Sequence, residues 1–334
     1  MSSSLSLSPE HQELFRAVSS KNIKTITRLS QRGVDLTAPD SDGVTPLYMA
    51  AELGYLSVIK KLVDLGCSGS INIPASDGST PVCVAAQQGH VEVIRYLAGL
   101  GASVVTPATN GATPVCVAAQ QGHVSVIKTL VKFGANINTP LSNRATPVFI
   151  AAQRGHLSAL RTLVELGAKV DTRCIDNLTP LAIASEMGHV DIVKALAGFG
   201  ANLNIRSESG ATATWLASQH GHVAVIAVLS DLGANLNTSD RDGFTPMCIA
   251  AQEGHVAAIK ALASGGANVN FPNNNGATPI LLAAYEGNVE VIESLVSLNA
   301  LVATSNKYGD TPVSYVNFIL YLPTLINLCP VTWN

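Results

Sequence analysis

A period of 33 residues constrains this sequence more than any other feature. The dipeptide Thr-Pro recurs along the chain, and Ala213 fills the one gap in phase. The prolines are Pro46, Pro81, Pro114, Pro147, Pro180, Pro246, Pro279 and Pro312, and every step from Pro81 onward is 33 residues, counting Ala213, whereas the first is 35. Self-similarity at such a period predicts an array of stacked small units instead of separate globular domains.

Each period predicts two short helices joined by turns. In residues 77–109, Asp-Gly suits a tight hairpin turn, and Thr80-Pro81 begins a helix that ends at Gly89. A second helix begins near His90, because apolar residues then recur at a spacing of three and four. One unit alone leaves apolar surface on both sides, so neighbouring units must stack to bury it.

The repeated pattern D/N-G-x-T-P-x-x-x-A-A-x-x-G-H-V, followed by an amphipathic helix and L-G-A-N, closely resembles the ankyrin repeat. The resemblance extends from about Glu13 to Thr311. It implies an all-α fold with short β-hairpin tips, in which helix–turn–helix–hairpin units stack into a curved α-solenoid. We expect a disordered Ser-rich start at 1–8, an atypical capping repeat at 9–41 and a partial ninth repeat from 308 to 334. The eight complete repeats are expected at 42–76, 77–109, 110–142, 143–175, 176–208, 209–241, 242–274 and 275–307.

Two departures from the family pattern affect local structure. The family's T-P-L-H histidine, which helps to hydrogen-bond the start of the inner helix, is absent, and we expect packing to replace it. Its positions hold Tyr48, Cys83, Cys116, Phe149, Ala182, Trp215, Cys248 and Leu281, of which Trp215 is expected in the core. The hairpin glycine is replaced by Arg144 and Asn177, where a left-handed backbone is tolerated by asparagine and strained for arginine.

The recurring cysteines and histidines are interpreted as structural. Cys83 and His90 are separated by about 10 Å of helix, too far to share a metal. Stacked helices about 8–10 Å apart also exceed disulfide reach between Cys83 and Cys116, so Cys83, Cys116 and Cys248 are expected to pack as small hydrophobes. The Gly-His histidines are expected to support the start of each outer helix, with His220 out of phase. With no catalytic motif in the chain, we expect no enzyme activity, metal or cofactor.

Charge and cysteine usage limit the class of partner and the compartment. The formal net charge is −3, and no basic run exceeds the pair Lys60-Lys61, which argues against nucleic acid. Six widely spaced cysteines suit reduced thiols in the cytoplasm or nucleus, and MSSSLSLSPEHQ is not a secretory signal.

By register with the family, a partner would lie on the concave face, formed by the hairpin tips and the exposed side of the inner helices. An apolar patch of Ile175, Leu178 and Met187, with His220 and Phe244 beyond it, is the predicted centre of binding; the alternative is that these are scattered surface hydrophobes. The complete predicted set is Gln87, Gln88, Gln120, Gln121, Gln153, Arg154, Ile175, Leu178, Met187, His220, Arg241, Phe244, Glu253 and Tyr285.

The sequence therefore predicts a monomeric, non-catalytic intracellular scaffold that binds another protein. The alternative is the ankyrin arm of a larger enzyme, channel or ligase adaptor whose C-terminal part is missing or misread. The segment 311–334 motivates this alternative because it leaves the repeat pattern and carries no charge. It is interpreted as a hydrophobic cap, as a truncated or misread end, or as a membrane span that Pro323 and Pro330 disfavour.

Overall fold

The computed structural model describes residues 8–316, and within them the chain forms helices and turns without any strand. Its contacts divide into two compact units, residues 1–169 and 170–334. Ser8 is the N-cap of the first helix, as the sequence Ser8-Pro9-Glu10 predicts, since its hydroxyl accepts a hydrogen bond from the His11 amide. The rest of the Ser-rich start and residues 317–334 of the C-terminal segment lie outside the described residues.

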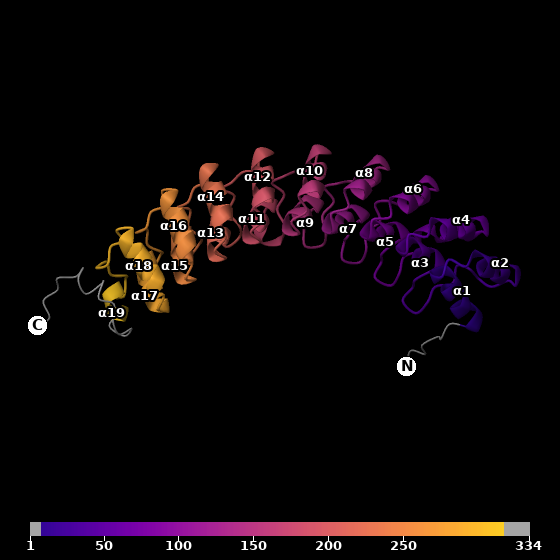
Figure 1. The fold of residues 1–334 in the computed structure, drawn as a ribbon, viewed down its shortest axis with the longest axis horizontal. Coiled ribbons are helices and arrows are strands. Elements are labelled where there is room, and N and C mark those ends of the chain that lie inside the picture. The colour runs from indigo at the N-terminus through magenta and orange to yellow at the C-terminus, as the bar shows by residue number, and fades with distance from the viewer. Residues whose placement is uncertain (1–7, 317–334) are drawn as a thin grey trace, which may run out of the picture. The chain divides into compact units, whose positions relative to one another are not determined.

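In each unit, inner and outer helices alternate along the chain and form two layers (Figure 1). The inner helices of the first unit are α1 (Pro9–Ser19), α3 (Pro46–Glu52), α5 (Pro81–Gln88), α7 (Pro114–Gln121) and α9 (Pro147–Gln153). Its outer helices are α2 (Ile23–Gln31), α4 (Leu56–Asp64), α6 (Val91–Gly99), α8 (Val124–Lys132) and α10 (Leu157–Glu165). The 35-residue first step contains an additional 3₁₀ helix, η1 (Cys67–Asn72), which takes up its extra length.

The second unit has the same order of elements. It begins with the 3₁₀ turn η2 (Ile175–Asn177), and its inner helices are α11 (Pro180–Glu186), α13 (Ala213–Gln219), α15 (Pro246–Gln252), α17 (Pro279–Glu286) and α19 (Pro312–Val316). Its outer helices are α12 (Val190–Gly198), α14 (Val223–Asp231), α16 (Val256–Ser264) and α18 (Val289–Ser297). The expected helix–turn–helix units are thus confirmed, whereas the repeat boundaries themselves stay a prediction.

Apart from α1 and α13, each inner helix begins at a Thr-Pro dipeptide for a local reason. The threonine adopts an extended backbone, and its hydroxyl accepts a hydrogen bond from the third helical amide, as Thr80 does from Cys83 at 3.3 Å. Proline lacks a backbone N–H, but at the first helical position this costs no hydrogen bond, because an N–H there has no acceptor within the helix. At Thr278 the hydroxyl is buried and, among the described residues, has no such bond.

The core lies between successive helices of the same layer. The side chains of Ile94 and Leu97 in α6, and of Ile127 and Leu130 in α8, are fully buried where the two outer helices meet. Inner helices approach one another through alanine pairs such as Ala118-Ala119, which are also fully buried. Because each interface removes apolar surface of two units from water, the stack is stabilised between neighbours, as the 33-residue period predicts.

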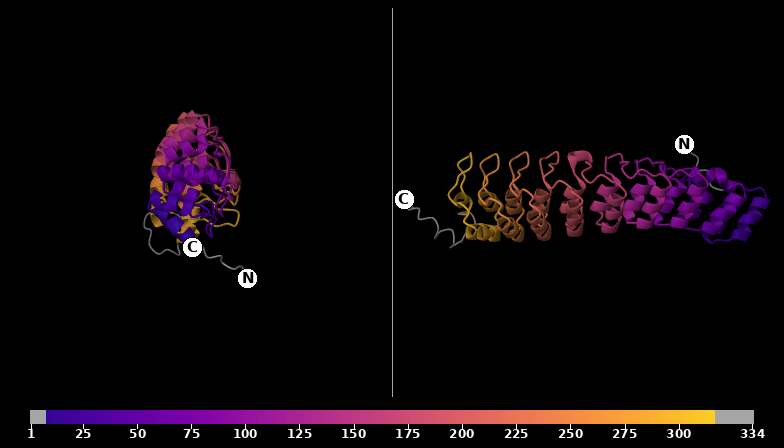
Figure 2. Two further views of the ribbon diagram at one scale, coloured as in Figure 1. Left: turned by 90° about the vertical axis from the view of Figure 1, so that its right-hand side faces the viewer. Right: turned by 90° about the horizontal axis from the view of Figure 1, so that it is seen from above.

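The hairpin tips project to one side of the helix layers and are closed by turns (Figure 2). Backbone bonds join neighbouring tips: the Ser76 amide donates to Asp42 at 2.8 Å and the Thr109 amide to Asp77 at 2.9 Å. Arg144 and Asn177 take the hairpin-glycine position with φ of 64° and 57°, so the expected left-handed backbone is confirmed at both. The tips expected as short β-hairpins are therefore turns that hydrogen-bond to one another without regular strands in the described residues.

The Gly-His histidines connect each repeat to the one before it. In the first unit, imidazole Nε2 of His90, His123 and His156 donates to the carbonyls of Glu52, Gln87 and Gln120, at 2.9, 3.1 and 3.0 Å respectively. In the second unit, His222, His255 and Asn288 make the equivalent bonds to Glu186, Gln219 and Gln252. The expectation that these side chains support the start of their own outer helix is wrong. They bind the carboxyl end of the inner helix in the preceding repeat, where backbone carbonyls lack helical partners.

The glycine before each histidine makes room for the next ring. A Cβ atom at Gly122 would lie 2.9 Å from the imidazole of His156, and Gly122 has a φ of 75°. Glycine is required at this position for two reasons. Any other residue would strain the left-handed backbone, and its Cβ atom would collide with the histidine of the following repeat.

A second set of polar contacts between neighbouring repeats, which we call the asparagine ladder, lies just after the outer helices in the chain. The side-chain oxygen of Asn204 accepts from the Asn235 amide, and that of Asn237 from the Asn268 amide, both at 2.8 Å. Asn72 and Asn138 make the same type of bond in the first unit. The asparagine two residues after the L-G-A-N or F-G-A-N segment, or Asn72 in the first repeat, therefore satisfies a backbone amide of the next repeat, at the opposite end of the helix layers from the histidines.

We expect His156→Ala to lower the free energy of unfolding by about 1 kcal/mol, because the Gln120 carbonyl loses a partly buried hydrogen bond. His156→Asn should retain most of the stability, since Asn288 makes the same bond at the equivalent position. Urea denaturation followed by circular dichroism measures both. His220→Ala, at an exposed site, is the control; equal losses at positions 156 and 220 would contradict the assignment.

Candidate functional site

The hairpin tips and the exposed side of the inner helices form one surface in each unit, which we call the inner face. Every residue of the predicted binding set lies there at least partly exposed, and none is buried. At the first position after the Ala-Ala pair, Gln87 and Gln120 have a scaffold role through their backbone carbonyls, which accept the histidine bonds. Their side chains take no part in these bonds.

In the first unit, part of the inner face is lined by several glutamines. Gln87, Gln120 and Gln121 line one pocket of about 230 Å³ between α5 and α7, which we call the glutamine pocket. Cys83 and Cys116, at the positions of the absent histidine, also line it, together with Asp77 from a hairpin tip. Gln88, Gln153 and Arg154 are exposed but do not line this pocket.

The predicted patch of the second unit is divided by the structure. Leu178 and Arg241 line a pocket of about 450 Å³, the Leu178 pocket, with Leu216 on its apolar side and the carboxylates of Asp176, Glu186 and Glu208 among its lining groups. Ile175 and Met187 do not line it, and their side chains are 51% and 42% exposed. His220 and Glu253 are also exposed without lining it. The predicted binding set includes Leu178 and Arg241 but not the carboxylates, which come from two successive tips and the end of α11.

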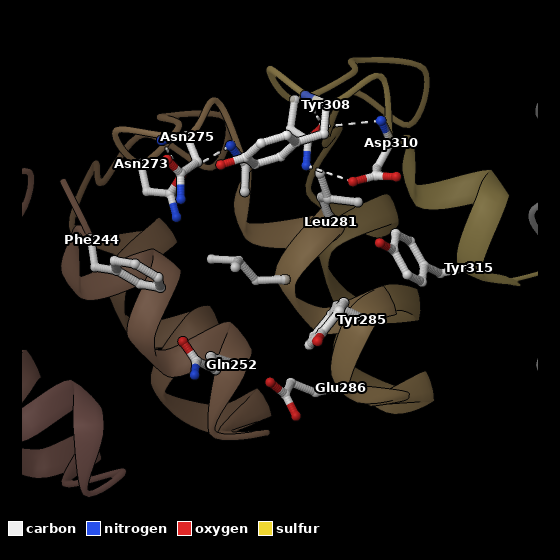
Figure 3. A pocket seen from close by; sticks show the side chains of 13 residues that line it. Phe244, Gln252, Asn273, Asn275, Leu281, Tyr285, Glu286, Tyr308, Asp310 and Tyr315 are labelled. Carbon is white, nitrogen blue, oxygen red and sulfur yellow. Dashed lines mark hydrogen bonds between the residues drawn. The ribbon is translucent and has the colours of Figure 1, made fainter. Parts of the chain in front are cut away.

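Phe244 and Tyr285 belong to a different pocket, of about 400 Å³, which we call the tyrosine pocket. Figure 3 shows their rings with those of Tyr308 and Tyr315 around the leucines of α17. The rings of Tyr285 and Tyr315 meet edge to face, with centroids 5.5 Å apart. The sequence reasoning missed Tyr308 and Tyr315, because they lie on a tip and helix beyond the last complete repeat.

Polar side chains partly replace the absent T-P-L-H histidine. The indole Nε1 of Trp215 donates to the Phe244 carbonyl at 3.0 Å, and the Tyr48 hydroxyl hydrogen-bonds Ser79 at 2.7 Å. The expectation that packing alone substitutes for the histidine is therefore wrong at these repeats. Trp215, expected in the core, is only partly buried and packs against Ala182, Ala211 and Leu216.

The comparisons with known proteins are consistent with this repeated geometry. A family model described as ankyrin repeats (3 copies) matches residues 14–108, 102–174, 168–240 and 228–306. A similar curated protein is the putative ankyrin repeat protein FPV223 of Fowlpox virus (strain NVSL), 39% identical over 51 residues. That match covers 15% of this chain and 36% of the viral protein, so the chain spans about a third of that relative's length.

Among solved structures, the chain is similar to the crystal structure of the human ASB11 ankyrin repeat domain. The sequence identity is 27% and the TM-score 0.60, and the similarity covers 66% of this chain and 98% of the human domain.

The cysteine side chains described in residues 8–316 are buried. No group of three or more histidine, cysteine or acidic side chains in this range is arranged to hold a metal. No described helix has the length and apolar character needed to cross a membrane. The side chains of Cys67, Cys83, Cys116 and Cys248 are buried, and burial raises the pKa of the Cys83 thiol to about 12 and that of Cys67 to about 11.

We expect Cys67 and Cys83 to react with iodoacetamide at pH 8 about a hundredfold or more slowly in the folded protein than in urea. The thiolate is the nucleophile, and a raised pKa leaves less of it at this pH, while burial also blocks access. Peptide mapping by mass spectrometry separates the rates at the two sites. Equal rates in folded and unfolded protein would show that these thiols are not buried.

Proposed function

The chain belongs to the ankyrin repeat family, and we propose that it is a non-catalytic scaffold that binds another protein through the inner face of residues 170–316. Ankyrin repeats mediate protein–protein interactions and are typically non-catalytic. We further propose that the chain acts as a monomer in the cytoplasm or nucleus, and that the inner face is the concave one.

The observation that carries the proposal is the pair of exposed apolar side chains beside the Leu178 pocket. Ile175 is on a tip and Met187 follows the last turn of α11, and both expose large apolar groups. Interfaces take most of their energy from a few such anchors placed near pockets, with polar groups around them. Arg241, Asp176 and Glu208 supply charged groups around this pocket.

The scaffold would help binding by holding these side chains in place before the partner arrives. The tip of this repeat is bonded to the next one, since the Glu208 amide donates to Asp176 at 2.7 Å. The end of α11 is held by His222, which donates to the Glu186 carbonyl at 2.8 Å. A surface organised in this way loses little conformational entropy on binding.

An alternative is that the chain is the partner-recruiting arm of a larger enzyme, channel or ligase adaptor. The solved human relative is itself described as a domain, and the viral relative extends well beyond the matched part. The binding face would be the same in both cases, so the experiment below tests the proposal that they share.

We expect Ile175→Ala with Met187→Ala to weaken partner capture about tenfold or more, as expected when two anchors of an interface are truncated. The full chain serves as bait in extracts of the native cells, and quantitative mass spectrometry compares the proteins retained by wild type and variant. Affinity for a purified candidate is then measured by titration calorimetry.

The matched control is Val223→Ala with Leu232→Ala, which removes two exposed apolar side chains from the ends of α14 in the same unit. Both variants should retain the circular dichroism spectrum of wild type. Equal retention of partners by wild type and the Ile175/Met187 variant would refute the proposed centre of binding.

A further inference from the structure

The tyrosine pocket combines an apolar floor with exposed aromatic rings. Leu281, which occupies the position of the absent histidine, is 3% exposed and leaves the floor without a polar group there. Tyr285 is 67% exposed and Tyr308 is 75% exposed. In Figure 3, Phe244 lies on one side of the pocket and Tyr285 and Tyr315 lie on the other. Exposed aromatic rings gathered around a hollow are typical of binding sites, because much of their apolar surface stays open to a ligand.

The charged groups of this pocket are negative. Glu286 and Asp310 line it, and none of its described lining residues is lysine or arginine. Neither carboxylate takes part in an ion pair between described residues. Asp310 accepts a hydrogen bond from the Asn306 side chain at 3.0 Å through one oxygen, which holds this carboxylate at the edge of the pocket. Charge complementarity therefore favours a cation.

Tyrosines elsewhere in the chain show that the protein itself uses such rings to hold cations. The Lys21 ammonium lies 4.0 Å from the ring centroid of Tyr55, and that of Lys60 lies 5.6 Å from the centroid of Tyr96. No lysine or arginine within residues 8–316 takes this position over Tyr285, Tyr308 or Tyr315. The tyrosine pocket thus has aromatic rings suited to a cation–π contact, whereas in the first unit lysines of the chain itself make such contacts.

We propose that the tyrosine pocket binds an arginine side chain of the partner protein, with the guanidinium against the tyrosine rings and paired with Glu286 or Asp310. Arginine fits better than lysine, because its planar, weakly hydrated cation stacks on aromatic rings while its N–H groups donate to carboxylates. This inference rests on the proposed function, because the arginine belongs to a protein that the inner face binds, but it uses residues separate from Ile175 and Met187.

The test uses the full chain with ¹³C-labelled tyrosine rings and follows their NMR signals during peptide titrations. The probes are three acetylated peptides, Gly-Ser-X-Ser-Gly, in which X is arginine, lysine or citrulline. Citrulline has nearly the shape of arginine without its charge. The arginine peptide should shift the signals of Tyr285, Tyr308 and Tyr315 and leave those of Tyr48, Tyr55 and Tyr96 unchanged.

Two variants test the residues that would bind the cation. Glu286→Gln and Tyr308→Leu should each lower the affinity for the arginine peptide about fivefold to tenfold, as expected for loss of one charged or cation–π contact. Glu290→Gln is the matched control, because it removes the same charge from an exposed site on α18 in the same repeat. It should leave the affinity unchanged.

The proposal is overturned if citrulline or lysine binds as tightly as arginine, or if Glu290→Gln weakens binding as much as Glu286→Gln. It is also overturned if the pocket tyrosines do not respond, which would leave the pocket to another occupant, such as the chain's own residues after Val316. If the tyrosines fail to respond while capture still depends on Ile175 and Met187, only this inference fails. If they respond while capture does not depend on those residues, the proposed centre of binding fails alone.

Discussion

The hydrogen bond from one repeat's histidine to the end of the preceding inner helix is the contact on which the ordered stack depends. Burial of apolar surface between neighbours supplies most of the stabilisation, but it is non-directional and does not select one register. The hydrogen bond from His156 to the Gln120 carbonyl selects one register, because it can form in only one alignment of the two successive repeats. Gly122 completes the selection, since a side chain there would occupy the space of the imidazole ring.

The same use of backbone groups leaves the inner face free for recognition. The histidines, the tip-to-tip amides and the asparagine ladder bind main-chain atoms, so the stack can form whatever side chains occupy the exposed positions. Equivalent positions can therefore differ widely: the site that holds Gln87 beside the glutamine pocket holds Tyr285 beside the tyrosine pocket. Closely similar scaffolds thereby present a glutamine-lined polar surface in the first unit and an aromatic, acidic one near the end of the second.

Features that depend on a few consecutive residues were predictable. Thr80-Pro81 begins a helix and Gly89 ends it as expected, and Arg144 takes the left-handed backbone that its place in the turn requires. The role of His156 was not predictable, because its hydrogen-bond partner Gln120 is 36 residues earlier in the chain and the Gly-His dipeptide suggests a helix start. Leu178 and Phe244 were predicted to share one patch, yet they line different pockets, because neighbouring tips and helices separate them. Tyr315 was missed because it follows the loss of the repeat pattern.

The sequence by itself determined the repeating unit, its helices and the family to which the chain belongs, because capping, turn chemistry and apolar spacing act within one period of 33 residues. It also indicated that residues such as Gln87, Leu178 and Tyr285 would be at least partly exposed, since register repeats with the fold. The tertiary structure decided how those side chains group into pockets and which of them meet carboxylates or rings of the next repeat. It alone could do so, because each pocket is built from two or more successive repeats, and its shape depends on contacts between residues that are about 30 positions apart.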